Sequence, residues 1–250
     1  MGNILILSGG LDSTVSAFDR VLSAGIPSSC VPDERSRGED QPPPGSSSVL
    51  ALTFDYGQRA AEQEKKAAAF VAAQLGIEHK VIGLPWLKEL TQTSLVSTQQ
   101  VLPQLKISEL DDFQKTTESA KNVWVPNRNG VFLNIAATFA ESLGCDTIIT
   151  GFNAEEAVTF PDNSADFVKT ANRFFSFSTL NKVQVKSYTQ QMTKEEIVRK
   201  GVELGVDFSK IWSCYEGGEK QCGRCESCLR SIRAYKAAGI WDKARGAYAD

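Results

Sequence analysis

The sequence is short of basic charge and of long apolar runs, and each shortage excludes a class of function. Its 250 residues include 27 Lys and Arg against 30 Asp and Glu, a formal net charge of −3, so the chain lacks the basic excess of a general nucleic-acid binder. No apolar run approaches the ~20 residues that cross a bilayer, and no charged segment precedes an apolar one as in a signal peptide. We therefore expect a cytoplasmic protein with no membrane association and no direct nucleic-acid partner.

Histidine is scarcer still, because His79 is the only one. With no second histidine and no cysteine cluster beside it in the sequence, we interpret His79 as structural or exposed. Apolar residues are not scarce. At 42% of the chain, they suffice for a sizeable core in one large domain, or in one domain with a small appendage.

Short apolar runs alternate with helical periodicity along most of the chain. Strands are expected at 4–7, 49–54, 80–84, 147–150 and 183–187, and helices at 12–24, 59–75, 130–143 and 193–205, the last opened by the capping box Thr193 and Glu196. Residues 27–48 are rich in Pro, Ser and charge and are interpreted as a mobile insertion, while 86–122 is not assigned. This alternation predicts an α/β fold, with a Rossmann-like parallel sheet, helices on both faces, and a ligand at the carboxyl ends of the strands.

The first chemical motif, SGGLDST, follows the first expected strand and opens the first helix. Glycines let a ligand approach the backbone, and the helix start offers unpaired N–H groups and a positive dipole end. The residues of this motif exclude a Walker loop, which needs Gly-Lys-Ser/Thr. They also exclude a dinucleotide fingerprint, which needs a third glycine where this chain has Ser13. An ordinary tight turn is the alternative, but the full string favours a phosphate or pyrophosphate site. Its residues are Ser8, Gly9, Gly10, Leu11, Asp12, Ser13 and Thr14.

The second motif, CYEGGEKQCGRCESC, gathers Cys214, Cys222, Cys225 and Cys228 in one loop. Four thiolates suit a closed, tetrahedral, structural Zn²⁺ site. Disulfides fit poorly with the expected compartment, whereas an iron–sulfur cluster or redox chemistry stays open because spacing alone does not choose the metal. Cys30 and Cys145 lie outside the loop and are given no role.

The first motif resembles the pyrophosphate loop of the PP-loop ATP pyrophosphatases, which are adenine-nucleotide α-hydrolases. That resemblance implies a loop that holds the pyrophosphate released when ATP adenylates a carboxylate or carbonyl oxygen. Asp12 would then help to place Mg²⁺, because a carboxylate beside phosphates would repel them without a cation.

The two motifs together are similar to the 7-cyano-7-deazaguanine synthase family of the queuosine pathway. Further matches are LTFDYGQR at 52–59, VPNRN at 125–129, GFN at 151–153, KEEI at 194–197 and WSCY at 212–215. The resemblance covers nearly the whole chain apart from 27–48 and 86–122. It implies a PP-loop catalytic domain over 1–205, and a zinc-binding loop with a C-terminal helix over 206–250.

The family's reaction adenylates 7-carboxy-7-deazaguanine, lets ammonia displace AMP to give the amide, and uses a second ATP to turn the amide into the nitrile. The resemblance implies ATP, Mg²⁺ and one structural Zn²⁺ as cofactors and small molecules as partners, and it leaves a homodimer open. Arg128 would hold a phosphate or the substrate carboxylate and Lys194 a phosphate, and the alternative for each is a surface ion pair. The implied catalytic residues are Asp12, Ser13, Arg128 and Lys194, the nucleotide contacts add Asp55 and Tyr56, and the substrate contacts are Asn127, Arg128, Asn129, Gly151, Asn153, Pro161 and Asp162.

One segment departs from the family, which commonly has Asp-Tyr-Ser-Gly-Tyr-Pro-Asp-Cys-Arg where this chain has EEAVTFPDNS at 155–164. Asn163 and Ser164 replace a cysteine and an arginine, and losing an arginine removes a bidentate contact to an anion. Arg173 is a candidate replacement. The alternatives are therefore a ligase that stops at the amide, or one that joins the deazaguanine carboxylate to a protein amine.

Two other classes of function account for one motif but not for both. A sulfur-inserting PP-loop enzyme that acts on a tRNA base would need a basic surface and often a spare Cys-x-x-Cys, which this chain lacks. A non-enzymatic zinc module that binds nucleic acid or a partner would leave the pyrophosphate loop without a purpose.

Overall fold

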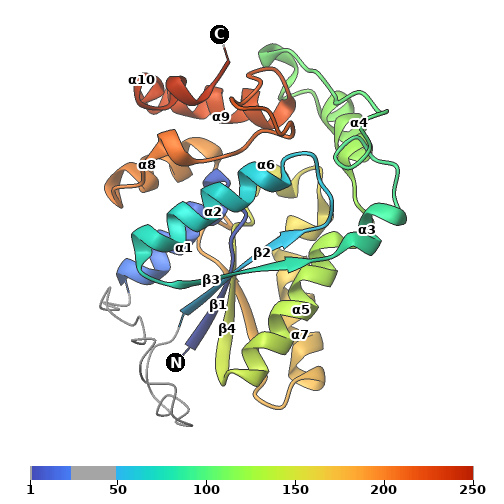
Figure 1. Cartoon of the computed structure of the whole chain (residues 1–250), viewed down its shortest axis with the longest axis vertical. Coiled ribbons are helices and arrows are strands. Elements are labelled where there is room, and N and C mark those ends of the chain that lie inside the picture. The colour runs from blue at the N-terminus through green and yellow to red at the C-terminus, as the bar shows by residue number, and fades with distance from the viewer. Residues whose placement is uncertain (1, 24–48, 250) are drawn as a thin grey trace.

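The computed structural model describes residues 2–23 and 49–249, so the predicted insertion at 27–48 and Cys30 lie outside the described residues. At the centre is a five-stranded sheet in the order β3-β2-β1-β4-β5, and every neighbouring pair is parallel (Figure 1). The strands are β1 (Gly2–Ile6), β2 (Val49–Asp55), β3 (Glu78–Gly83), β4 (Cys145–Thr150) and β5 (Gln184–Ser187). The expected parallel sheet is confirmed.

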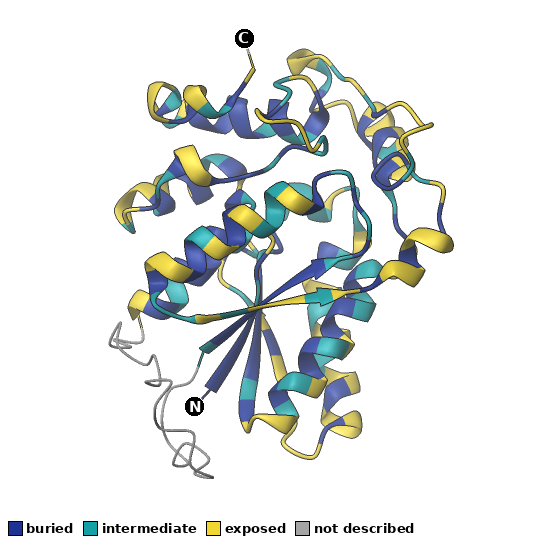
Figure 2. Ribbon diagram, viewed as in Figure 1, coloured by how far each residue is buried: buried dark blue, intermediate teal, exposed yellow. Residues whose placement is uncertain are grey.

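Helices cover both faces of the sheet because its central strands are apolar on both sides. Along β1, Ile4 belongs to the core on one face and Leu5 to the core on the other, as the two-residue repeat of a strand requires. The Leu5 face is covered by α1 (Leu11–Ser23) and α2 (Ala61–Leu75), and the Ile4 face by α5 (Arg128–Ser142) and α7 (Ala165–Ser178). Figure 2 shows the central strands buried between these layers. The predicted α/β class is confirmed.

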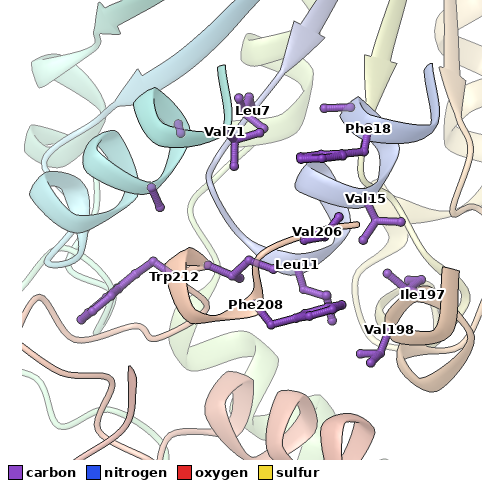
Figure 3. Close-up of a cluster of buried hydrophobic side chains, with 14 of the residues drawn as sticks. Leu7, Leu11, Val15, Phe18, Val71, Ile197, Val198, Val206, Phe208 and Trp212 are labelled. Atoms are coloured by element: carbon purple, nitrogen blue, oxygen red, sulfur yellow. The ribbon is translucent and has the colours of Figure 1, made fainter. Parts of the chain in front are cut away.

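A third layer lies over α1 and is built from the C-terminal part of the chain. Ile197 and Val198 of α8 (Lys194–Glu203) join Val15 and Phe18 of α1 in one buried cluster (Figure 3). Next to α8 lies α9 (Glu226–Ala237), which leads into α10 (Trp241–Ala244). The C-terminal segment is therefore anchored to the sheet through α8 and α1.

The strands and helices expected from the sequence are present, with ends moved by one or two residues. Residues 86–122, which the sequence left unassigned, carry α3 (Pro85–Glu89), η1 (Ile107–Glu109) and α4 (Phe113–Val123), with a long irregular stretch between α3 and η1. The start of α4 is fixed by Asp112, whose side chain accepts hydrogen bonds from the backbone N–H groups of Gln114 and Lys115.

Helix α7 is an element that the sequence reading missed. Ser164 caps its start, and Phe167, Ala171 and Phe175 follow at a spacing of four residues on the side that faces the sheet. That spacing is a usable helix signal. The short elements are α6 (Ala154–Ala157), η2 (Pro161–Asn163), η3 (Phe208–Lys210) and η4 (Arg245–Ala247). Of the helices described, none is both long and apolar enough to cross a membrane.

The topology places a crevice between the carboxyl ends of β1 and β4. From β1 the chain winds outward through β2 to β3, and it then returns to the other side of β1 to form β4 and β5. The segments after β1 and β4 meet there, because a Cβ on Gly151 would lie only 2.4 Å from the backbone N of Ser13. Ligands of open α/β sheets bind at such a switch point.

Candidate active site

A cavity opens at this switch point. Its wall comes from the phosphate loop (Ser8–Thr14), the end of β2, the starts of α5 and α8, the loop after β4 and the segment that carries the cysteines. The polar side chains in the wall include Ser8, Asp12, Ser13, Tyr56, Glu64, Arg128, Asn129, Glu156, Asn163, Lys194, Ser213, Tyr215 and Ser227.

The phosphate loop needs its two glycines for different reasons. Gly9 has a φ of 73°, and a Cβ there would lie 2.6 Å from the Cβ of Ala67 and 2.7 Å from the backbone N of Ala68 in α2. Gly9 therefore lets the loop lie against α2, which differs from the ligand approach expected from the sequence. Gly10 lines the cavity, and a Cβ there would come no nearer than 3.2 Å to a neighbour, the Oγ of Ser8.

Hydroxyl groups close the phosphate loop on itself. Ser13 Oγ accepts a hydrogen bond from Ser8 N (3.3 Å), lies 3.0 Å from Ser8 Oγ and donates to Gly10 O (3.3 Å). Gly10 N in turn donates to Ser8 Oγ at 3.2 Å. Leu11 and Thr14 are buried under the loop. The loop is thus shaped by its own side chains at the positive end of α1, an arrangement suited to an anion.

Lys194 links the start of α8 to the phosphate loop. Its Nζ lies 2.5 Å from Asp12 Oδ2 and 2.6 Å from Glu156 Oε1, and its side chain is only 7% exposed. The capping box expected at Thr193 and Glu196 is present, and it fixes the helix end that carries Lys194. We call Asp12, Glu156 and Lys194 the lysine triad.

The two acids of the lysine triad are held unequally. Burial disfavours the charged form of Lys194, but Asp12 and Glu156 outweigh it and raise the pKa of the lysine. Burial raises the pKa of Asp12 to about 6 against the attraction of Lys194, whereas for Glu156 Lys194 outweighs burial and lowers the pKa. Asp12 Oδ1 is buried with no hydrogen-bond partner among the described residues. Asp12 is therefore the acid that is poised to accept a further cation.

Arg128 is a half-buried cation at the start of α5. It donates from Nη1 to Tyr56 Oη at 3.0 Å, and its guanidinium lies 5.6 Å from the centre of the Tyr56 ring and 6.0 Å from that of Phe132. Its Nε is buried without a partner, and no carboxylate within 2–23 or 49–249 lies at ion-pairing distance from it. Burial opposes the charge of Arg128, but the groups around it, Tyr56 and Asp162 foremost, raise its pKa. Free guanidinium N–H groups of this kind suit an oxygen of a ligand.

Glu64 of α2 places a further carboxylate in the wall. Its Oε2 accepts a hydrogen bond from Gln58 Nε2 at 2.7 Å, and Gln58 is itself held by Tyr56 N (2.9 Å) and Phe54 O (3.0 Å). Burial raises the pKa of Glu64, and the Gln58 hydrogen bond and the charge of Arg128 oppose that shift. The segment after β2 thus fixes the position of this carboxylate.

The four cysteines of the second motif come together in the fold. Their Sγ atoms all lie within 4.8 Å of one another, and those of Cys222 and Cys228 are 3.9 Å apart. That distance is close to the ~3.8 Å edge of a tetrahedron with Zn–S bonds of ~2.3 Å and far from the ~2.05 Å of a disulfide. Backbone N–H groups of Glu216 and Cys222 donate to Cys214 Sγ, and that of Cys225 donates to Cys222 Sγ. The cluster has the ligands and the size of a closed metal site.

The cysteine loop (Cys214–Cys228) also forms part of the cavity wall. Three wall residues lie in it or directly before it, namely Ser213, Tyr215 and Ser227. Trp212 N donates to Gly9 O at 2.9 Å, and the Trp212 indole N–H donates to Cys214 O at 3.0 Å. The phosphate loop and the cysteine loop are therefore neighbours on one side of the cavity.

Comparison with known proteins identifies the family. The family described as "Queuosine biosynthesis protein QueC" matches residues 44–239. A 7-cyano-7-deazaguanine synthase from Pelotomaculum thermopropionicum is 54% identical over 240 residues, which cover 96% of this chain and 99% of that protein. The chain belongs to the QueC family. Synthases of the same name from Bdellovibrio bacteriovorus and Desulforamulus reducens are 48% and 45% identical, over 95% and 96% of this chain and 94% and 96% of their own lengths.

In this QueC family member, the residues predicted for the site fall into two groups. Those in the cavity wall are Ser8, Gly10, Leu11, Asp12, Ser13, Tyr56, Arg128, Asn129, Gly151 and Lys194. Those outside the wall are Gly9, Thr14, Asp55, Asn127, Asn153, Pro161 and Asp162.

Three residues outside the wall of the QueC site shape the backbone around it. Asp55 pairs with Lys65 at 2.9 Å. Asn127 is exposed at a φ of 52° before α5, and Asn153 is fully buried and caps α6 by accepting from Glu156 N at 3.0 Å. His79, interpreted as structural, is half-buried in β3 with its Nε2 2.8 Å from Thr53 Oγ1.

The segment that departs from other QueC sequences lies at the rim of the cavity. Asn129 Nδ2 donates to Asp162 O at 3.3 Å, so the two motifs expected to bind substrate do meet. Asn163 is buried and lines the wall, while Ser164 accepts from Phe167 N at 3.1 Å as the cap of α7. Arg173 is exposed on α7 and does not line the cavity.

Sequence reasoning missed several wall residues of the QueC site: Glu64, Phe132, Glu156, Asn163, Ser213, Tyr215 and Ser227. Some lay inside motifs that were recognised, since Ser213 and Tyr215 belong to WSCY and Glu156 is the second residue of the departing segment. Glu64 gave no signal, because it reaches the site only through the packing of α2 beside the phosphate loop.

Proposed function

We propose that the chain is a 7-cyano-7-deazaguanine synthase, which uses ATP to convert 7-carboxy-7-deazaguanine and ammonia into the nitrile. The observation that carries the proposal is the relative of that name that is 54% identical over 96% of this chain and 99% of its own length. The site supports it, because a phosphate loop, two cationic side chains and aromatic rings line one cavity.

In the first stage, the substrate carboxylate attacks the α-phosphorus of ATP and pyrophosphate leaves. Backbone N–H groups at the start of α1 and the hydroxyls of Ser8 and Ser13 would hold the leaving pyrophosphate. Lys194, fixed by its two carboxylates, would place a positive charge beside it, and Arg128 would hold an oxygen of the substrate or of a phosphate. Ammonia then attacks the acyl adenylate, and AMP leaves with one of the original carboxylate oxygens.

In the second stage, the amide oxygen attacks the α-phosphorus of a second ATP at the same loop. Loss of AMP and of the two protons on nitrogen leaves the nitrile. The two AMP molecules together carry off both oxygens of the original carboxylate. The protein's main task in both stages is to align the oxygen with phosphorus and to stabilise the leaving phosphates.

The residues present fit the two metal ions that this chemistry implies. Asp12 would hold Mg²⁺ that arrives with ATP, because its Oδ1 is buried without a hydrogen-bond partner among the described residues and a carboxylate beside phosphates requires a cation. Mg²⁺ bound there would neutralise phosphate charge. The four cysteine thiolates would hold one Zn²⁺ in a closed site that keeps Ser213 and Tyr215 in the wall and does no chemistry.

We also propose how the molecule is organised. Residues 1–205 would form the ATP-dependent unit and 206–250 a zinc-stabilised unit packed on it. The partners would be small molecules in the cytoplasm, with no direct nucleic-acid binding, in keeping with the net charge of −3. Whether two copies associate is a question for sedimentation or light scattering of the pure protein.

The test is to incubate pure protein with Mg-ATP, ammonium in excess and 7-carboxy-7-deazaguanine, and to identify products by mass spectrometry. We expect the nitrile and two pyrophosphates per substrate consumed. Amide with a ratio near one would mean a ligase that stops halfway. A requirement for an added protein amine would favour the conjugating alternative, and no conversion of ATP to AMP would favour a non-enzymatic zinc module.

Substrate labelled with ¹⁸O in the carboxylate sharpens that test. Each AMP formed should carry one labelled oxygen, because each adenylation joins a substrate oxygen to the α-phosphorus. Label found in inorganic phosphate or in pyrophosphate would contradict attack at the α-phosphorus.

A further inference from the structure

The reaction described above gives no task to Glu64, although its carboxylate lies in the cavity wall. Gln58 occupies Oε2 at 2.7 Å, and Oε1 accepts no hydrogen bond from the residues that the structure describes. Glu64 also forms no ion pair with a described residue. Glu64 is half-buried and lines the cavity without a cation or a second donor among the described residues, and a ligand with N–H groups would satisfy it.

Arg128 lines the same cavity and has a hydrogen-bond donor without an acceptor. Its Nη1 is engaged by Tyr56, but Nε is buried without a partner. Glu64 and Arg128 are near enough to influence each other's pKa, yet they do not pair directly. The wall of this cavity therefore presents an acceptor and a donor that no described residue engages.

Aromatic side chains give that space a flat boundary. The Phe54 and Phe132 rings are stacked with centres 4.1 Å apart, and Tyr56 lies 5.8 Å from Phe132. All three line the cavity with Glu64 and Arg128. A planar heterocycle matches such a wall, because aromatic rings stack face to face at an offset.

We infer that Glu64 recognises the 2-amino-pyrimidinone edge of the substrate base, accepting hydrogen bonds from the ring N–H and the exocyclic amine, while Arg128 donates to oxygens on the neighbouring carbonyl side. This edge carries two adjacent donors followed by a carbonyl acceptor, which is the complement of a carboxylate followed by a guanidinium. Glu64 is thus the residue that selects a 2-amino base. The inference rests on the proposed function, since it is that reaction that supplies such a base.

A purely structural role would give Glu64 a different signature. As a clamp on Gln58, it would hold the segment after β2 in place, and its replacement would weaken every ligand alike. As the residue that recognises the base, it affects a ligand that carries the amine more than a ligand that offers the ring N–H alone. The two roles are separated by changing the ligand and the residue together.

The experiment measures calorimetric binding of 7-carboxy-7-deazaguanine and of its analogue with hydrogen in place of the 2-amino group, both without ATP. Wild-type protein should bind the analogue about 10- to 100-fold more weakly, as expected for the loss of a hydrogen bond to a charged group. This arm needs no variant. Equal binding of the two bases would overturn the inference and leave the proposed function standing, whereas binding of neither would overturn both.

The second arm uses Glu64→Gln, with Glu62→Gln as a matched control on the exposed side of α2, where the Glu62 side chain is 76% exposed. Glu64→Gln should weaken the parent base about 10- to 100-fold and the analogue clearly less, because the analogue offers only the ring N–H, which the amide oxygen of Gln still accepts. Glu62→Gln should change neither. Equal weakening of both bases, or a raised KM for ATP with base preference kept, would overturn the inference.

Discussion

The phosphate loop accepts a hydrogen bond at Gly9 O from Trp212 N, just before the cysteine loop, yet the two loops are held in different ways. Hydroxyls within the phosphate loop bond to its own backbone, and Gly9 packs against α2. The cysteine loop instead gathers four sulfurs whose described partners are backbone N–H groups and one another. The phosphate loop is closed by its own hydrogen bonds, whereas we propose that the cysteine loop depends on a metal ion held by the sulfurs.

Because of this difference, we expect substitutions in the phosphate loop to change turnover and substitutions in the cysteine loop to change the stability of the fold. Changes at polar groups of the phosphate loop should affect catalysis while the fold persists, because the loop carries few of the buried apolar contacts. Changes at the cysteines should affect the fold first and catalysis as a consequence. Metal removal and point substitutions can test whether turnover and stability change independently.

Removing the zinc that we propose should have the largest effect. Structural zinc contributes about 10–16 kcal/mol of apparent binding free energy in small domains, so chelation or Cys228→Ser should lower the melting temperature strongly and abolish turnover. Elemental analysis should find one zinc per chain. Cys145→Ala, at a buried cysteine outside the cluster, is the control that should keep the metal. Iron with inorganic sulfide in anaerobic protein would contradict the assignment.

Asp12→Ala should reduce pyrophosphate release about 100- to 1,000-fold, the usual cost of losing a group that stabilises developing charge. Ser13→Ala should act in the same direction. The melting temperature should stay near that of the wild type, which separates this effect from that of zinc removal. Asp19→Ala is the matched control, because it removes another acid of α1, one that pairs with Lys200 of α8. Near wild-type turnover in Asp12→Ala would contradict the assignment of the phosphate loop as the pyrophosphate site.

Gly9→Ala should destabilise the fold by at least about 2 kcal/mol, since a left-handed residue with a Cβ costs about 1–2 kcal/mol and overpacking adds to it. Gly239→Ala has a similar φ of 71° but no atom within 4 Å of the new Cβ, so it reports the backbone cost alone. Urea unfolding of both variants measures the difference. Equal losses of unfolding free energy in the two variants would show that α2 shifts to accommodate the new Cβ at no measurable loss of stability.

Ser164→Ala should have the smallest effect, a loss of about 1 kcal/mol from the cap of α7. The kcat and the KM for the deazaguanine should stay close to those of the wild type, because Ser164 does not line the cavity. Ser176→Ala, on an exposed part of the same helix, controls for the loss of a hydroxyl. A selective rise in substrate KM would instead assign Ser164 to the substrate, as the family's arginine at this position suggests.

Much of the fold could be predicted because its signals are local. Apolar strands and the capping box at Thr193 mark elements that depend on a few neighbouring residues, and the structure keeps them. The cysteine cluster was predictable for a similar reason, since its ligands lie within one short loop. Helix α7 was not predicted, because exposed phenylalanines such as Phe174 and Phe177 obscure the helical spacing of its buried stripe.

The rest of the site could not be derived because it is made by packing. Glu64 enters the wall when α2 lies against Gly9, and Asn127 stays outside it because its left-handed backbone turns the chain into α5. The pairing of Lys194 with Asp12 joins residues 182 positions apart in the chain. A sequence motif can indicate residues of the site, but the fold determines which of these residues contact one another.

The bond between Trp212 and Gly9 also orders events during synthesis. The phosphate loop is made before the segment around the cysteines, which completes its side of the cavity. Domains form from the N-terminus as the chain emerges, so the nascent sheet would carry an open loop until the cysteine segment arrives. Adenylating chemistry would therefore begin only on chains whose synthesis has passed the cysteine segment, so shorter nascent chains would not consume ATP.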